Sequence, residues 1–261
     1  MKSGFPKVLK TGEKYCFKTI DNYVFNEEGY PLSDRIIEHD FHKMTLGIIG
    51  DGISANKTDT DGNLIGYINL LSNKFESVIN YSKSGMCIAK SKNINTGIDI
   101  NVPSMVTEYT NIDQSIDIIL VACSSNDWNN SVPIDTDTDN DLYAYRDALE
   151  IIINGLLTTH VGKEIIFITP IHRHDTTHTT NQYESSIIKN AYDHTLSDYA
   201  DVIKEVCKKH SIPVIDLLNT CGIDFENEAH REIFTENGVH PNKNGHYRLY
   251  RRIYSALASL I

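Results

Sequence analysis

Cysteine is scarce in this sequence, and its pattern excludes two classes of site. The 261 residues hold five cysteines, an odd and scattered set without any CxxC pair: Cys16, Cys87, Cys123, Cys207 and Cys221. Such a set predicts neither a disulfide framework nor a thiol redox motif. We expect these residues to be small buried side chains in a reducing compartment.

Basic residues are also in short supply. Lys and Arg number 24 against 35 Asp and Glu, which gives a formal net charge of −11 and a pI near 5.4. An acidic chain of this kind lacks the electrostatic footprint of a protein that binds nucleic acid or an anionic membrane surface. We therefore expect no nucleic-acid partner and no membrane partner.

Long apolar runs are missing as well. Residues 1–7 lack the apolar core of a signal peptide, and no segment is apolar over the length needed to span a bilayer. We expect a product made as a soluble cytoplasmic protein, with association to a virion or a cell surface left open. Hydrophobic residues make up 40% of the chain, which is enough for one large α/β domain with a small appendage.

One stretch organises the rest of the chain. The almost wholly apolar residues 45–50 lead into Asp51-Gly52-Ile53-Ser54. Such a run predicts a buried central strand that ends in a tight turn. In α/β folds, turns of this kind lie at the carboxyl edge of the sheet, where sites are built.

Further strands and helices alternate along the chain. Apolar runs predict strands at 45–50, 78–81, 116–123, 164–169 and 212–216. Helical spacing predicts helices within 63–71 and over 142–157, 183–209 and 243–260, with a short one after Pro103. This alternation predicts a five-stranded parallel sheet with right-handed crossovers.

The first 43 residues do not fit that pattern. Alternating residues with aromatics at 14–20 and 22–25, followed by a turn at 26–31, suggest a short hairpin. We expect an N-terminal arm over 1–43 and the main domain over 44–261. The arm either packs on the domain or serves as an attachment segment to a larger assembly.

Four short blocks of the main domain resemble those of a known hydrolase family. They are Gly50-Asp51-Gly52-Ile53, Gly85 with the residues before it, Ser124-Ser125-Asn126-Asp127 and Asn237-Gly238-Val239-His240. In order and separation they look like the blocks of the SGNH (GDSL) hydrolases. The resemblance implies a three-layer α/β/α sandwich, flavodoxin-like in its layers, and the activity of an esterase, lipase or carbohydrate deacetylase.

The resemblance also implies a role for each block. His240 matches the catalytic base, Asn126 and Gly85 match the donors of the oxyanion hole, and Gly52 and Asn237 stand where the family has its nucleophilic serine and its acid. The residues around His240 also predict a rigid frame independently of the resemblance, because Gly238 permits a turn and Pro241 holds His240 extended. We expect Asp51, Ser124 and Trp128 to lie around the substrate, although Trp128 fits a core position equally well.

Two of these matches depart from the family. Gly52 has no hydroxyl, so no acyl intermediate can form there, and Asn237 cannot stabilise an imidazolium as a carboxylate does. Glu236 is adjacent and could replace the acid in part. Among other hydroxyls, Ser54 is expected to swing away from the Gly52 face, and Ser124 and Ser125 lie off the turn.

Other polar clusters predict no metal site or cofactor. His172, His174 and His178 with Asp175 lie in a polar loop without the fixed spacing of zinc ligands. The Asp-rich run 135–141 lacks the glycine and the closing glutamate of a calcium loop. We expect no metal and no cofactor.

Three functions remain at this stage. The first is an SGNH-type hydrolase of acylated carbohydrate or small esters, impaired or inactive because of Gly52. The second is a non-catalytic module that binds glycan or builds a cell-surface or phage-tail assembly. The third, a flavodoxin-like nucleotide binder, lacks the Gly-rich phosphate loop that it would need.

Overall fold

The computed structural model describes residues 41–55, 57–58, 62–175, 183–185 and 187–261. One compact unit spans Asp40–Ala256, and the site described below belongs to it. The hairpin and turn predicted within the first 43 residues lie outside the described part of the chain.

A five-stranded, all-parallel sheet forms the middle of this unit. Its order is β2-β1-β3-β4-β7, and the bounds are β1 Thr45–Gly50, β2 Ser77–Asn80, β3 Ile118–Ala122, β4 Glu164–Ile168 and β7 Val214–Ile215. All five predicted strands are present. The central strand β3 pairs with both β1 and β4, and all five of its residues are buried, as the continuous apolar run predicts.

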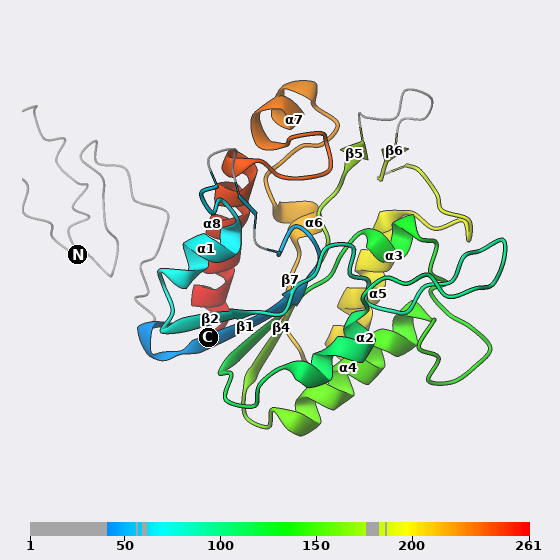
Figure 1. Cartoon of the computed structure of the whole chain (residues 1–261), viewed down its shortest axis with the longest axis horizontal. Coiled ribbons are helices and arrows are strands. Elements are labelled where there is room, and N and C mark those ends of the chain that lie inside the picture. The colour runs from blue at the N-terminus through cyan, green and yellow to red at the C-terminus, as the bar shows by residue number, and fades with distance from the viewer. Residues whose placement is uncertain (1–40, 56, 59–61, 176–182, 186) are drawn as a thin grey trace, which may run out of the picture. The chain divides into compact units, whose positions relative to one another are not determined.

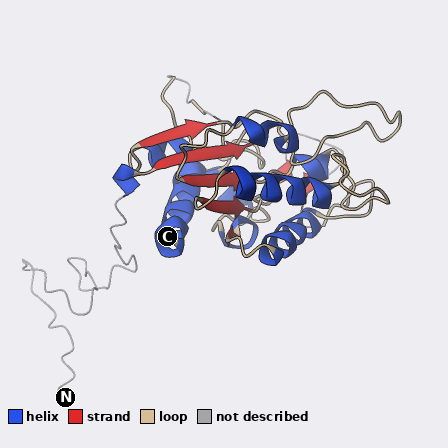
Figure 2. Ribbon diagram, turned by 90° about the horizontal axis from the view of Figure 1, so that it is seen from below, coloured by secondary structure: helices blue, strands red, loops and turns tan. Residues whose placement is uncertain are grey.

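Helices cover both faces of the sheet, with α2, α4 and α5 on one side and α1 and α8 on the other (Figure 1). The helices are α1 Tyr67–Ser72, α2 Met105–Glu108, α3 Asn126–Asn129, α4 Tyr145–Thr159, α5 Leu196–Lys209, α6 Leu217–Thr220, α7 Glu228–Phe234 and α8 Lys243–Leu260, with 3-10 turns η1 Phe41–Lys43 and η2 Tyr109–Asn111. Figure 2 shows the strands side by side and pointing the same way, with helices around them. The predicted three-layer α/β/α sandwich is confirmed.

The core follows from the periodicity of the helices. Helix α4 buries Ala148, Leu149, Ile152, Ile153 and Leu156, a spacing that places them on one face. They join the sheet and α5 in one hydrophobic cluster. The four described cysteines are free and buried. No helix in the described residues is long and apolar enough to cross a membrane.

One helix begins later than the sequence pattern predicted. The expected start of α5 was residue 183, but residues Tyr183–Glu184 form strand β6, which pairs antiparallel with β5, His174–Asp175. Helix α5 begins after Thr195, whose backbone N–H donates to the Asp198 carboxylate at 2.7 Å in a capping box. This local signal fixes the start of the helix, and Tyr192, which the predicted range 183–209 included, is 46% exposed.

Because all strands are parallel, the segments that follow them lie along the same edge of the sheet. The turn after β1, the segment after β2 and helix α3 after β3 are consecutive neighbours there, since β2, β1 and β3 are adjacent. This edge carries Gly52, Gly85 and Asn126, each in the segment that follows one of these strands.

Candidate functional site

The turn after β1 presents Gly52 in an open position. A Cβ added to Gly52 would lie 3.5 Å from Ser84 Oγ and 3.7 Å from Ser84 Cα, which are ordinary van der Waals contacts. Its φ lies outside the left-handed region, so an L side chain is sterically admissible here. The backbone at this position therefore has room for a serine side chain.

Asp51 supports the turn from within. Its carboxylate accepts the Ile53 N–H at 2.9 Å, and the side chain is buried. Burial raises the pKa of Asp51 to about 6, against the lowering effect of backbone N–H groups and of the Arg173 charge. Asp51 is thus a turn-forming residue with its carboxyl turned away from solvent.

Gly85 directly follows Ser84, the residue that faces Gly52, and Asn126 begins α3 after the adjacent strand β3. Gly85 has φ of +74°, and its N–H donates to no other group in the ranges described. Asn126 Nδ2 donates to the Met86 carbonyl at 3.0 Å, which fixes the amide next to Gly85 and leaves its second N–H. We call Gly52, Gly85 and Asn126 the strand-end group, because each follows one of three adjacent strands.

Ser124 completes the support of this group. Its Oγ donates to the Met86 carbonyl at 2.9 Å and accepts the Asn126 N–H at 3.0 Å. The side chain is buried. Ser124 therefore orients Asn126 and Met86, and its hydroxyl is engaged on both sides.

Asp127 anchors the same region from below, a role that the sequence did not reveal. Its fully buried carboxylate accepts the N–H groups of Ile88 at 2.8 Å and Ala89 at 3.0 Å. Burial raises the pKa of Asp127 to about 7, although these two donors lower it. The carboxyl thereby ties the segment after β2 to the start of α3.

The histidine loop, residues 235–242, brings Asn237 and His240 together. Asn237 Oδ1 accepts the His240 N–H at 2.9 Å and lies 3.3 Å from His240 Nδ1. It also accepts the Val239 N–H at 3.1 Å. A proton on Nδ1 is the arrangement that satisfies this contact, and it leaves Nε2 as the basic nitrogen.

Gly238 gives this loop its shape. It has φ of +75°, and an added Cβ would lie 1.8 Å from the His174 carbonyl oxygen, so a larger residue cannot be accommodated without a backbone shift. The His174 N–H donates to the Gly238 carbonyl at 2.8 Å. The loop is therefore tied to β5.

Glu236 fixes the other side of the loop. Its carboxylate forms an ion pair with Lys57 at 2.9 Å, and its backbone N–H donates to the His240 carbonyl at 2.9 Å. Glu236 thus faces the segment after β1 through Lys57. In this arrangement the Glu236 carboxylate, four residues before His240 in the chain, is paired with a lysine.

The predicted residues therefore form two groups at one edge of the sheet. Within each group the members are in contact or in sequence. An ion pair links the two groups, because Lys57 in the segment after β1 contacts Glu236 of the histidine loop at 2.9 Å.

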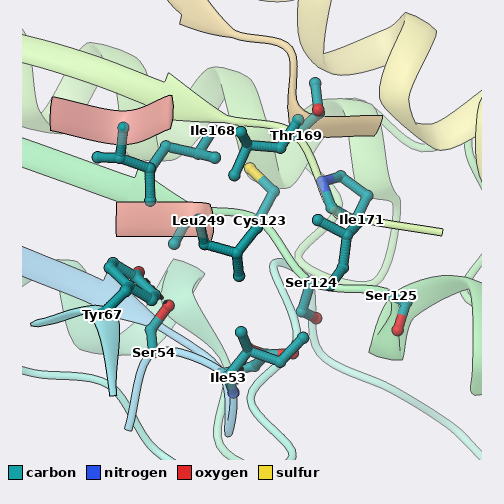
Figure 3. Close-up of a pocket in the computed structure, with 15 residues that line it drawn as sticks. Ile53, Ser54, Tyr67, Cys123, Ser124, Ser125, Ile168, Thr169, Ile171 and Leu249 are labelled. Carbon is teal, nitrogen blue, oxygen red and sulfur yellow. Dashed lines mark hydrogen bonds between the residues drawn. The ribbon is translucent and has the colours of Figure 1, made fainter. Parts of the chain in front are cut away.

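A cavity lies next to the turn after β1 (Figure 3), and its lining includes residues adjacent in the chain to Gly52 and Asn126 but none of the strand-end group itself. Its lining comes from the ends of β1, β3 and β4 and from α1, α6 and α8: Asp51, Ile53, Ser54, Tyr67, Ala122, Cys123, Ser124, Ser125, Ile168, Thr169, Pro170, Ile171, Leu217, Leu249 and Ile253. Ser54 Oγ and Tyr67 OH lie 2.6 Å apart, so the two hydroxyls pair in the wall of this cavity. The cavity is mainly apolar with a few hydroxyls, the usual character of a small-molecule site.

The remaining predicted residues lie elsewhere. Trp128 is buried in the core, with its Nε1 donating to the His194 carbonyl at 3.2 Å, which matches the core alternative. His172 Nδ1 lies 3.1 Å from Ser185 Oγ. Among the described residues, no group of three or more His, Cys, Asp or Glu side chains is arranged to hold a metal ion; His178 lies outside them.

Comparison with known proteins identifies the family. The sequence profile of the GDSL-like Lipase/Acylhydrolase family matches residues 48–248, which include every member of the strand-end group and the histidine loop. The chain belongs to this family. No sequence among the curated proteins matches it.

Solved structures share the fold of this family member at low sequence identity. A protein from Lactobacillus plantarum is 23% identical with a TM-score of 0.70, covering 84% of this chain and 98% of that one. A lipase/acylhydrolase from Enterococcus faecalis is 18% identical (TM-score 0.53; 83% and 96%). An acetyl xylan esterase, AlAXEase, is 17% identical (TM-score 0.55; 82% and 100%).

Proposed function

We propose that this GDSL-family protein is an ester hydrolase of acylated carbohydrate or small esters whose turnover is strongly reduced by Gly52. The observation that carries the proposal is the arrangement of N–H donors in the strand-end group. Gly85 and Asn126 keep their N–H groups beside a position that has room for a serine. Donors held in this way stabilise the oxyanion of an acyl-transfer reaction.

Each remaining residue has a defined task in this proposal. The Gly85 N–H and the second Asn126 N–H donate hydrogen bonds to the ester carbonyl oxygen, which stabilise the negative charge that develops on it. His240 Nε2 takes a proton from the attacking group and returns it to the leaving alkoxide, while Asn237 holds Nδ1–H. A single oxyanion donor contributes about 10²–10³-fold in such enzymes, so an intact hole retains measurable assistance.

The lining of the cavity favours a substrate with a short acyl group. It is lined by apolar side chains such as Ile53, Ile168 and Leu249, with the paired Ser54 and Tyr67 hydroxyls closing one wall (Figure 3). An acetyl group fits the mixed character of this lining. The acetyl xylan esterase among the structural neighbours makes acetylated glycan a reasonable first substrate.

Hydrolysis of p-nitrophenyl acetate and acetylated xylan tests this function. The natural chain should give a low rate, and Gly52→Ser should raise kcat/KM by about 100-fold or more, because it restores a nucleophile next to existing donors. Gly97→Ser is the matched control, since Gly97 lies on an exposed turn. Failure of Gly52→Ser to hydrolyse either ester, in a folded protein, would overturn the proposal.

A non-catalytic role is the second candidate, and Gly52 itself favours it. A descendant that has lost its nucleophile can keep the cleft to bind glycan or to build a cell-surface or phage-tail assembly. Titration with acetylated and deacetylated xylan oligosaccharides distinguishes the two. Binding without turnover, unaffected by Gly52→Ser, supports this second role.

A further inference from the structure

The position closest to Gly52 is occupied by a hydroxyl that the sequence blocks did not single out. Ser84 Oγ lies 3.5 Å from the Cβ that a residue at position 52 would have. A family serine would project its own hydroxyl one bond beyond that Cβ. Ser84 therefore places a hydroxyl in the immediate neighbourhood of the missing nucleophile.

Ser84 is also the accessible hydroxyl of this region. It is exposed, and within the described ranges its Oγ has no hydrogen-bond partner. By contrast, Ser54 is buried against Tyr67 and Ser124 is buried against Met86. A nucleophile must reach the substrate, and these two serines do not.

The sequence position of Ser84 fits an attack on an ester. It directly precedes Gly85, whose N–H is one of the two proposed oxyanion donors. In α/β-hydrolases one oxyanion donor is the N–H of the residue after the nucleophile. The φ of +74° at Gly85 lets the chain turn sharply between the Ser84 side chain and the segment that Asn126 binds at Met86.

We propose that Ser84 is the relocated nucleophile through which the residual ester hydrolysis of this protein proceeds. The inference rests on the proposed function. Ser84 Oγ forms a bond to the acyl carbon, the bond from that carbon to the leaving oxygen breaks, and the hydroxyl proton passes through His240 Nε2 to the leaving alkoxide. Water then attacks the acyl-Ser84 ester, which releases the carboxylic acid and regenerates the hydroxyl.

Covalent labelling of the full chain tests this assignment. A fluorophosphonate ester forms an oxygen–phosphorus bond with an activated serine and expels fluoride, and peptide mapping by mass spectrometry locates the adduct. The adduct is expected on Ser84. An adduct on Ser125, which lines the cavity, or no adduct at all, overturns the proposal.

Kinetics of variants test the assignment of Ser84 independently. Ser84→Ala should lower kcat/KM for p-nitrophenyl acetate by about tenfold or more. Ser82→Ala is the matched control two residues away, because its buried hydroxyl has no partner in the structure and should leave the rate unchanged. An unchanged rate in Ser84→Ala overturns the inference.

The Gly52→Ser background separates this inference from the function on which it rests. The double variant Gly52→Ser, Ser84→Ala should keep most of the restored activity, which also shows that the Ser84 change leaves the fold intact. If Gly52→Ser is active while the natural chain shows neither turnover nor adduct, the Ser84 proposal fails and the hydrolase proposal stands. If Gly52→Ser is also inactive, both fail.

Discussion

The two halves of the proposed site differ in the groups that they present. In the strand-end group, position 52 is a glycine with room for a side chain, and the Asn126 amide is held on the Met86 carbonyl. In the histidine loop, the Asn237 amide oxygen accepts the His240 N–H and contacts Nδ1. One half has no side chain at position 52, and the other has a neutral amide beside its imidazole.

This difference separates positioning from reactivity. The contacts that hold His240 include the Asn237 amide oxygen and the backbone N–H of Glu236, and neither requires a carboxylate at position 237. The contacts that shape the strand-end group come from Ser124 and Asp127, which are buried beneath it. Each half keeps its scaffold, and each scaffold can be tested apart from the chemistry.

The largest expected effect comes from placing a serine at position 52 and a carboxylate at position 237. Gly52→Ser alone should raise kcat/KM by about 100-fold or more, and adding Asn237→Asp should raise it further by about tenfold or more, since a carboxylate stabilises the imidazolium. Asn237→Asp alone, with Gly52 kept, should change the rate much less. A double-mutant cycle with p-nitrophenyl acetate measures this coupling.

The cycle has a clear contrary outcome. If the two substitutions act additively, His240 does not serve the group at position 52, and the two halves do not work as one site. Glu236→Gln is a further control. The Glu236 carboxylate is paired with Lys57, so removing its charge should not lower kcat/KM in the way that loss of an acid beside His240 would.

The second prediction concerns the stiffness of the histidine loop. Gly238→Ala should lower the free energy of unfolding by about 3 kcal/mol, because it combines a left-handed φ with a Cβ 1.8 Å from the His174 carbonyl oxygen. Gly97→Ala is the matched control, since Gly97 has φ of +67° but no atom within 4 Å. It should cost only about 1 kcal/mol.

Urea unfolding of the two variants measures the difference. Equal losses for Gly238→Ala and Gly97→Ala would mean that the loop moves away from β5 at little cost. The histidine half would then be the softer of the two, contrary to the contacts around Gly238.

The sequence predicted the sheet well because parallel strands buried on both faces read as continuous apolar runs. All five strands are present, and α8 has the bounds that were predicted, Lys243–Leu260. The start of α5 was misplaced because the apolar spacing was extended back through Tyr192, past the capping box at Thr195. A local cap outweighed periodicity there.

The site was less predictable for a physical reason. The blocks named its members, but sequence spacing does not report contacts between distant backbone and side-chain atoms. Asp127 binds backbone N–H groups 38 and 39 residues away. Ser84 becomes a candidate nucleophile only because its Oγ lies close to the Gly52 position. The one local signal for Ser84 was its place directly before Gly85.

The third prediction tests the buried support of the strand-end group. Asp127→Asn should cost about 1–3 kcal/mol of unfolding free energy, because the amide can accept from only one of the Ile88 and Ala89 N–H groups with its oxygen. Asp113→Asn is the matched control, since Asp113 accepts the Ser115 N–H at 2.8 Å in an exposed turn. It should cost less than about 0.5 kcal/mol.

The same variant carries a pH signature. A carboxyl whose folded pKa is raised to about 7 binds more protons when folded, so its contribution to stability falls as pH rises from about 4 to 7. Asp127→Asn should lose this slope. A variant with the slope of the natural chain would show that Asp127 is ionised throughout this range.

The smallest predicted effect tests the support of the other half. His246 is buried at the start of α8, and the Tyr67 N–H donates to its Nδ1 at 3.4 Å. Burial, with a smaller contribution from the Lys57 charge, lowers the pKa of His246 to about 4. The folded state therefore binds fewer protons than the unfolded state between about pH 6.5 and 4, and stability is lost as pH falls through this window.

Comparison with His246→Gln isolates this contribution, because the opposite slopes of Asp51 and Asp127 are shared by both proteins and cancel. Between pH 7.5 and 5.5 the natural chain should lose about 1 kcal/mol more unfolding free energy than the variant. Urea titrations at the two pH values measure the difference. An equal loss in both would mean that protonation of His246 does not disturb its contact with Tyr67. The α8 side of the histidine half would then accept a charge at little cost, unlike the buried region around Asp127 beneath the strand-end group.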